Sequence, residues 1–290
     1  MTSRRWASSV RSFTSRKSDV GKGNTMVETY KLWEGDIPYS IGGQEPLLTY
    51  YKTTNKLGRG TVIICPGGAY SGLAPHEGQG YATFLNSRGL DAFVLEYRVA
   101  PNVYPAALAD ARRAIRFVRH NAEKFGIDPD KIAIMGSSAG GHLAAHASTY
   151  VGELAGEIGD EIDKESCIPN AQILCYPVLD INGHRGSYVH LLTEERCGEL
   201  ADSVTPRVLA KEGTPPAFMW HTAEDNIVNV CNTYRYATRL KELSVPVEMH
   251  IFPFGKHGLG LADQQSRTEP HVAQWSELLC EWLMLIEFID

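Results

Sequence analysis

Short apolar runs alternate with longer segments of helical periodicity along most of the chain, and this alternation constrains the fold more than any other feature. Each run is rich in β-branched or aromatic residues and has the length of one strand. Strands that alternate with helices form a largely parallel sheet flanked by helices, so the sequence predicts an α/β fold. The runs expected as strands are 61–65, 92–97, 132–135, 172–176, 217–222 and 247–252, after a β-hairpin region at 30–51.

The segment 106–125 has the clearest helical pattern. Pro105 precedes it and Gly126 follows it, as is typical of the start and the end of a helix. Its small and apolar residues recur at three- and four-residue steps and therefore share one face. These residues are Ala107, Ala111, Ala114, Ile115, Val118 and Ala122. Further helices are expected at 81–88, 140–150, 230–243 and 272–289.

The chain has 290 residues, and we expect one domain over 26–290. The segment 182–216 is polar and only weakly periodic, which favours a small cap inserted between two strands. Residues 1–25 hold six Lys and Arg residues and one acid, with no apolar stretch of a secretory signal. They are expected to be a disordered basic tail, although a transit peptide or a true start at Met26 remains open.

The composition favours an ordered domain that acts on small molecules. Hydrophobic residues make up 43% of the chain and charged residues 21%, and no apolar run is long enough to cross a membrane. The net charge is −6, and residues 1–25 carry +5, so the remainder carries −11. An acidic body repels phosphates, which disfavours nucleic acid and anionic membranes as partners. Six scattered cysteines without a C-x-x-C pair favour reduced thiols in a cytoplasmic protein, with no metal and no cofactor.

The sequence from Gly136 to Gly140 reads Gly-Ser-Ser-Ala-Gly and matches the G-x-S-x-G pattern between an expected strand and an expected helix. The pattern needs small residues on both sides because the serine stands at a sharp turn where a Cβ atom would meet neighbouring backbone. The turn exposes the hydroxyl above the sheet, beside the N–H groups at the start of the helix. Ser138 is therefore the candidate nucleophile. The alternative is a Gly/Ser-rich turn without chemistry.

A serine hydroxyl becomes a nucleophile when an imidazole removes its proton and a carboxylate orients that imidazole. His257 follows the last expected strand in a glycine-rich loop, whereas His142 falls on a helix and is expected to be a packing residue. Asp225 follows the strand 217–222, which gives the chain order Ser138, Asp225, His257 that α/β-hydrolases use. The other carboxylates considered for the acid are Asp180, Glu224 and Asp263.

A glycine-rich loop follows the first expected parallel strand and reads Cys65-Pro66-Gly67-Gly68-Ala69-Tyr70. From this position the fold supplies backbone N–H groups that stabilise the oxyanion of the transition state. We expect the donors to be the N–H groups of Gly68, Ala69 and Ala139. An ordinary turn is the alternative, because Gly-Gly pairs are common in turns.

Together these motifs resemble the acetylesterase and carbohydrate-esterase branch of the α/β-hydrolases, over about 62–282. The resemblance rests on four stretches: Ile64 to Tyr70, Pro75-His76-Glu77-Gly78, Tyr97 to Ala106, and Gly136 to Leu143. Two residues depart from the family pattern. Ala69 replaces a third glycine, which keeps the N–H group, and His76 stands where the family often has arginine, which affects the acyl or sugar contacts of that loop.

The resemblance implies an α/β-hydrolase fold and hydrolysis of short acyl esters, with acetylated sugars such as xylo-oligosaccharides as plausible substrates. In this reading Ser138 forms an acyl-enzyme on a small-molecule ester. Alternatives are a formamidase or amidase with the same triad, a broad-specificity carboxylesterase, and a binding protein without activity. A metal-dependent deacetylase is disfavoured, because the chain has no H-E-x-x-H motif or clustered ligand set. The sequence does not indicate an oligomeric state.

Overall fold

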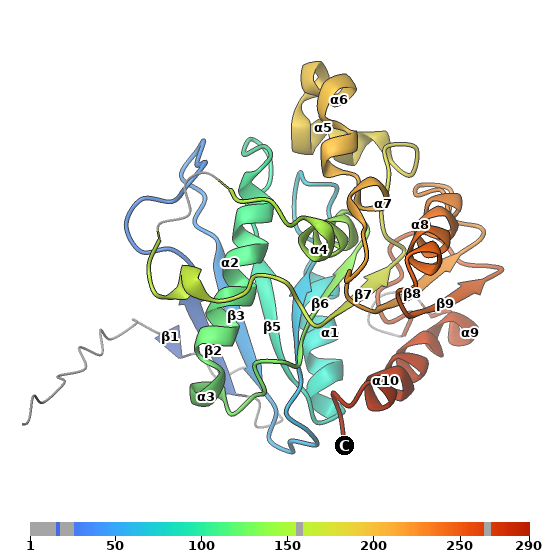
Figure 1. Ribbon diagram of the computed structural model, residues 1–290. Coiled ribbons are helices and arrows are strands. Elements are labelled where there is room, and N and C mark those ends of the chain that lie inside the picture. Colours follow the sequence, from blue (N-terminus) through green and yellow to red (C-terminus); the bar gives the residue numbers. More distant parts are fainter. Residues whose placement is uncertain (1–15, 18–25, 155–158, 264–267) are drawn as a thin grey trace, which may run out of the picture.

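The computed structural model describes residues 16–17, 26–154, 159–263 and 268–290 (Figure 1). The strands of this part of the chain form one nine-stranded sheet in the order β1-β2-β3-β5-β4-β6-β7-β8-β9. Their bounds are β1 Arg16–Lys17, β2 Met26–Lys31, β3 Leu47–Lys52, β4 Thr61–Cys65, β5 Asp91–Glu96, β6 Ile132–Ser137, β7 Ala171–Cys175, β8 Ala217–Thr222 and β9 Val247–Phe252.

The strands from β4 to β9 are parallel to one another, and β1, β2 and β3 add an antiparallel edge. The predicted α/β fold is therefore confirmed. β2 and β3 pair antiparallel, with Tyr30 opposite Leu48, as the expected hairpin does, but β2 begins at Met26, before the expected region 30–51. Arg16 and Lys17, from the segment expected to be a disordered tail, pair with β2. The remainder of that segment lies outside the described residues.

Helices cover both faces of the sheet. Their bounds are α1 Pro75–Ser87, α2 Ala106–His120, α3 Ala122–Phe125, α4 Ala139–Thr149, α5 Arg185–Leu192, α6 Glu194–Leu200, α7 Pro206–Leu209, α8 Cys231–Glu242, α9 Pro270–Ala273 and α10 Trp275–Leu285. One apolar cluster joins the sheet to α2, α4 and α8, and a second joins it to α1 and α10. Successive residues of a strand enter different clusters, as Val62 and Ile63 do, because their side chains point to opposite faces of the sheet.

Helix boundaries differ from the sequence-based expectation at three places. The expected helix 106–125 is two helices, because Asn121 turns its side-chain amide onto the Phe117 carbonyl at 2.8 Å. The expected helix 272–289 divides at Gln274 into α9 and α10 and ends earlier. α1 begins at Pro75 rather than at residue 81, since proline fits the first turn of a helix.

The segment 182–216 is helical rather than irregular. It contains α5, α6, a 3₁₀ turn at Asp202–Val204 and α7, and Figure 1 shows α5 and α6 standing above the sheet. Its weak periodicity reflects the shortness of these helices, none of which is longer than 8 residues. The segment lies between β7 and β8 in the chain, as expected.

The structure also bears on the cysteines and on membranes. All six cysteines are free thiols, and only Cys231 is exposed. Among the described residues, no helix combines the length and the apolar character that crossing a membrane requires.

Candidate active site

The candidate residues come from loops that follow four strands of the sheet. Gly68 and Ala69 follow β4, Ser138 follows β6, Asp225 follows β8 and His257 follows β9. These strands are parallel, so their carboxyl ends meet at one edge of the sheet. In open parallel sheets this edge is where ligands bind. Topology therefore brings together residues that are more than 100 positions apart in the sequence.

Ser138 occupies the sharp turn that the G-x-S-x-G pattern predicts. Its backbone angles are φ 53° and ψ −118°, a conformation that few non-glycine residues adopt, and α4 begins at the next residue. The turn is held by a 3.0 Å hydrogen bond from the Ser138 N–H to the Cys175 carbonyl. Gly140 is required there, because an added Cβ atom would lie 2.0 Å from the Cys65 carbonyl oxygen.

Ser138, His257 and Asp225 form a continuous chain of hydrogen bonds. The Ser138 Oγ atom lies 2.9 Å from His257 Nε2, and His257 Nδ1 lies 2.6 Å from Asp225 Oδ2. A carboxylate only accepts, so the Nδ1 atom carries a hydrogen and donates it to Asp225. In the neutral imidazole the Nε2 atom is then left as an acceptor for the serine hydroxyl. This is the arrangement that activates a serine.

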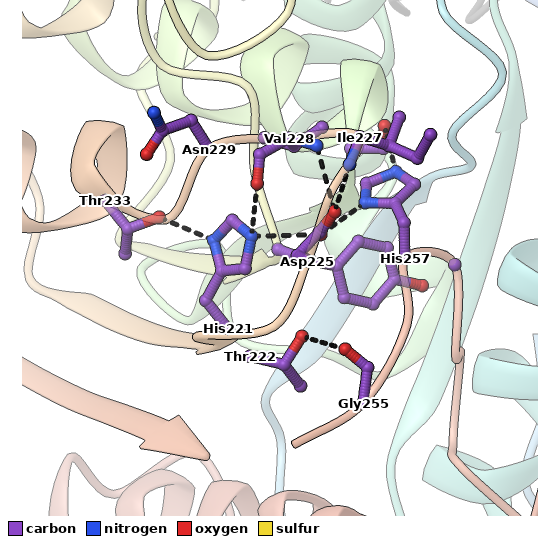
Figure 2. Close-up of polar contacts among 12 residues, drawn as sticks. His221, Thr222, Asp225, Ile227, Val228, Asn229, Thr233, Gly255 and His257 are labelled. Carbon is purple, nitrogen blue, oxygen red and sulfur yellow. Dashed lines mark hydrogen bonds and ion pairs between the residues drawn. The ribbon is translucent and has the colours of Figure 1, made fainter. Parts of the chain in front are cut away.

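Asp225 is buried and receives hydrogen bonds at both oxygen atoms. Its Oδ1 atom accepts the N–H groups of Ile227 and Val228, each at 2.9 Å. Its Oδ2 atom lies between the rings of His257 and His221 (Figure 2). Burial acts to raise the pKa of this carboxyl, but the hydrogen bonds from His221 and His257 outweigh burial and hold the pKa below its ordinary value. Asp225 is therefore ionised at neutral pH.

His221 contacts the candidate acid Asp225, and the sequence analysis did not single it out. Its Nε2 atom faces two acceptors, Asp225 Oδ2 at 3.1 Å and the Val228 carbonyl at 3.2 Å, so Nε2 must carry the hydrogen. Its Nδ1 atom lies 2.8 Å from the Thr233 hydroxyl. Burial lowers the pKa of this imidazole, which favours the neutral form. Its place four residues before Asp225 in the sequence is the signal that could have indicated this contact.

The other carboxylates considered for the acid lie elsewhere. Asp180 is paired with Arg235 at 2.9 Å and accepts the Gly183 N–H. Glu224 accepts the Gly255 N–H at 3.0 Å, at the base of the loop that carries His257. Asp263 lines a surface cavity of about 370 Å³. Asp225 hydrogen-bonds the His257 ring at 2.6 Å, as the orienting acid must.

The loop after β4 has the open backbone that an oxyanion hole needs. Gly68, Ala69 and Tyr70 have positive φ angles of 135°, 55° and 58°. A Cβ atom on Gly68 would lie 2.1 Å from the Gly72 carbonyl oxygen, so that position requires glycine. Within the described part of the chain, the N–H groups of Gly68, Ala69 and Ala139 donate no hydrogen bond. These are the three groups that the sequence predicted as donors.

The helical segment 182–216 contacts this loop directly through His190 and indirectly through His142 of α4. The His190 ring donates from Nδ1 to the Ala69 carbonyl at 2.8 Å. The His142 ring contacts the Tyr70 hydroxyl at 2.7 Å with one nitrogen and the Val204 carbonyl at 2.8 Å with the other. Burial lowers the pKa of His142 to about 4, so this ring is neutral. His142 is a packing residue, as expected.

The described residues contain no cluster of three or more His, Cys, Asp or Glu side chains that could hold a metal ion. The Ser138 hydroxyl, the His257 imidazole and the Asp225 carboxylate are hydrogen-bonded in that order. The backbone N–H groups predicted as oxyanion donors lie on two loops at the same edge of the sheet. Such a set suits attack on a carbonyl carbon followed by stabilisation of the resulting oxyanion.

The fold and this site place the chain among the α/β-hydrolases, and comparison with known proteins defines the family. The profile of the BD-FAE family matches residues 48–240, and the chain belongs to this family. A solved acetyl ester-xyloside bifunctional hydrolase from Caldicellulosiruptor lactoaceticus is 39% identical, with a TM-score of 0.83. The alignment covers 90% of this chain and 97% of that one.

Two curated relatives are longer than this chain. Endo-1,4-beta-xylanase B of Butyrivibrio fibrisolvens is 34% identical over 242 residues, which cover 81% of this chain and 38% of that protein. Acetylxylan esterase of Xylanibacter ruminicola is 30% identical over 214 residues, 71% of this chain and 42% of that protein. The chain therefore spans about two fifths of the length of these relatives.

Proposed function

We propose that this protein is a serine esterase that hydrolyses short acyl esters. The observation that carries the proposal is the pair of contacts from Ser138 Oγ to His257 Nε2 at 2.9 Å and from His257 Nδ1 to Asp225 Oδ2 at 2.6 Å. Residues that act as nucleophile, base and orienting acid must be within hydrogen-bond reach in this order.

In the proposed mechanism, Ser138 Oγ bonds to the ester carbonyl carbon while its proton passes to His257 Nε2. The oxygen of the tetrahedral intermediate is stabilised by the N–H groups of Gly68, Ala69 and Ala139. His257 then gives the proton to the leaving alcohol as the ester bond breaks, and an acyl-enzyme remains. A water molecule repeats the sequence and releases the acid. Asp225 keeps the imidazole oriented and stabilises its charged form.

Acetyl esters of sugars or xylo-oligosaccharides are the proposed substrates. Relatives named as an acetylxylan esterase and an acetyl ester-xyloside hydrolase support this class. The segment 182–216 supports it as well, because its contacts with Ala69 and with the His142 ring bring short helices over the loop after β4. We propose that this segment is a small cap, which limits the room beside Ser138 and favours a short acyl group.

The test of the activity is Ser138→Ala, assayed with an aryl acetate. We expect kcat to fall by roughly 10⁴- to 10⁶-fold, because the nucleophile is lost while the N–H groups of the oxyanion loop remain. The unfolding temperature should change little, since only one oxygen atom is removed. Turnover by Ser138→Ala close to that of the wild type would refute the proposal.

The test of the substrate class is a panel of esters from acetyl to octanoyl, together with acetylated xylo-oligosaccharides and formanilides. We expect kcat/KM to be highest for acetyl groups and to fall with chain length. Equal rates from acetyl to octanoyl would indicate a broad-specificity carboxylesterase. Faster turnover of formanilides than of aryl acetates would indicate an amidase.

A further inference from the structure

A buried carboxylate that the proposed mechanism does not use lies behind the loop after β4. Glu77, in the first turn of α1, is 3% exposed. Its Oε2 atom accepts the Gly67 N–H at 2.7 Å, and its Oε1 atom accepts the Tyr176 hydroxyl at 2.6 Å. Glu77 therefore joins the loop after β4 to the residue that follows β7.

The charge environment of Glu77 is unusual for a buried acid. Within the described parts of the chain, the one basic group at ion-pair distance is the His76 imidazole, at 3.7 Å and 40% exposed. Burying a carboxylate is costly unless its oxygens are well hydrogen-bonded, and an apolar residue often fills such a space at lower cost. Both hydrogen bonds of Glu77 go to segments that border the candidate site, which indicates a role there.

The connection continues from Tyr176 to the loop that carries His257. The Tyr176 hydroxyl oxygen accepts the Gly260 N–H at 3.0 Å. The Tyr176 ring lies edge-on to the His257 ring, with ring centres 5.1 Å apart. The His76 Nε2 atom also contacts the Gly258 carbonyl at 3.2 Å. Three residues of the loop that carries His257 therefore contact either α1 or Tyr176.

The backbone at Gly67 and Tyr176 is adapted to the contacts of Glu77. A Cβ atom at Gly67 would lie 2.5 Å from Glu77 Oε2, so the first glycine of the loop leaves room for the carboxylate. Tyr176 has a φ angle of 35°, which is costly for a residue with a side chain. Its N–H group is held by the Trp220 carbonyl at 2.7 Å.

We propose that Glu77 is a positioning residue that fixes the loop of Gly68 and Ala69 relative to the loop of His257, acting through Gly67 and Tyr176. The inference rests on the proposed esterase function, and it assigns Glu77 no contact with the substrate. Since displacement of a catalytic group by about 1 Å can cost about 10²-fold in rate, loss of this connection should lower kcat.

The chemistry of the two hydrogen bonds determines the variant. Both partners donate, so position 77 must present two acceptors, and a carboxylate does so. Glutamine has the same size but only one acceptor oxygen, so Glu77→Gln cannot accept from both donors, and if it keeps the Gly67 N–H bond the Tyr176 hydroxyl can no longer donate to position 77. Tyr176→Phe removes the other end of the connection and leaves Glu77 in place.

The experiment measures kcat and KM for an aryl acetate in Glu77→Gln, Tyr176→Phe and the double variant. We expect each single variant to lose roughly 10- to 100-fold in kcat, with KM changed by less than about 3-fold. The double variant should lose about as much as one single variant, because both changes break the same connection. Independent effects that multiply in the double variant would overturn the proposal.

Asp91 offers a matched control at the opposite edge of the sheet, at the start of β5. It is also a buried carboxylate that accepts the Tyr50 hydroxyl at 2.9 Å and the Thr53 N–H at 2.8 Å, and unlike Glu77 it is also paired with Lys56 at 2.7 Å. We expect Asp91→Asn to lower the unfolding temperature and to leave kcat within about 2-fold. An equal loss of kcat in Asp91→Asn would show that destabilisation explains the effect and would overturn the proposal.

Two further outcomes are decisive. If Glu77→Gln fails to fold, the test is made with Tyr176→Phe. A kcat equal to that of the wild type, in either variant, overturns the proposal. Ser138→Ala is measured alongside these variants: if it is inactive while Glu77→Gln is fully active, only the positioning role fails, whereas activity in Ser138→Ala refutes the esterase function itself.

Discussion

The carboxylate of Asp225 sets which nitrogen of His257 carries the hydrogen, and Asp225→Asn tests this directly. The two oxygens of Asp225 have different partners. Oδ1 accepts the backbone N–H groups of Ile227 and Val228, and Oδ2 faces the rings of His257 and His221. An asparagine must keep its carbonyl oxygen toward the two backbone donors, so its NH₂ group takes the place of Oδ2.

That NH₂ group reverses the hydrogen bond to His257. It can only donate, so the Nδ1 atom of His257 must accept and the ring hydrogen moves to Nε2. The Nε2 atom then has no lone pair for the Ser138 proton. We expect kcat to fall by about 10⁴-fold, the scale found when a triad carboxylate becomes an amide, which corresponds to about 5 kcal/mol in the barrier. The NH₂ group also meets the N–H of His221, so stability should fall by about 1–3 kcal/mol.

The assay is hydrolysis of an aryl acetate near pH 8, with urea unfolding of the same samples. Asp180→Asn is the matched control, because Asp180 is also buried and follows the neighbouring strand, but it is paired with Arg235. We expect Asp180→Asn to keep kcat within about 3-fold. The reasoning is refuted if Asp225→Asn retains more than a tenth of the wild-type kcat, or if both variants lose activity equally.

Two further predictions concern stability. Burial lowers the pKa of His142 to about 4. Between about pH 6.5 and pH 4 the unfolded chain therefore binds a proton at this residue that the folded chain excludes. The free energy of unfolding should fall by about 3 kcal/mol as the pH falls through this range. The free energy of unfolding, measured with urea, should differ less between pH 7 and pH 4.5 in His142→Gln than in the wild type. An equal difference in both proteins would contradict this. Gly140→Ala should cost about 3 kcal/mol or more, because its Cβ atom would lie 2.0 Å from the Cys65 carbonyl oxygen, whereas Gly80→Ala in open space on α1 should stabilise by about 0.5–1 kcal/mol. Equal effects of these two substitutions on the unfolding temperature would contradict the packing argument.

The parallel strands were predictable because each is a short apolar run between turn residues. Expected and observed bounds agree at β4, β8 and β9, and those of β5, β6 and β7 differ by one or two residues. β1 was not expected, and β2 begins four residues before the expected hairpin region. Helix ends were less predictable. The end of α2 depends on the Asn121 side chain folding back onto the Phe117 carbonyl, and no periodicity in the sequence reports such a choice.

The positions of the candidate residues were also predictable to a large extent. The G-x-S-x-G pattern places Ser138 by local backbone geometry, and the chain order indicates Asp225 and His257. The role of each residue in catalysis stays a prediction. His221 and Glu77 were not recognised, since each acquires its meaning from partners on other elements, such as Tyr176, which is 99 positions from Glu77.

The sequence by itself determined the order of the parallel strands and of the main helices between them, the sharp turn at Ser138 and the glycines that this turn requires, because these depend on neighbours within a few residues. Only the tertiary structure decided which carboxylate meets His257, how His221 shares that carboxylate, and which loops Glu77 connects. The physical reason is that hydrogen bonds act over about 3 Å. Parallel strand ends bring distant loops within that reach, and only three-dimensional packing settles which donor faces which acceptor.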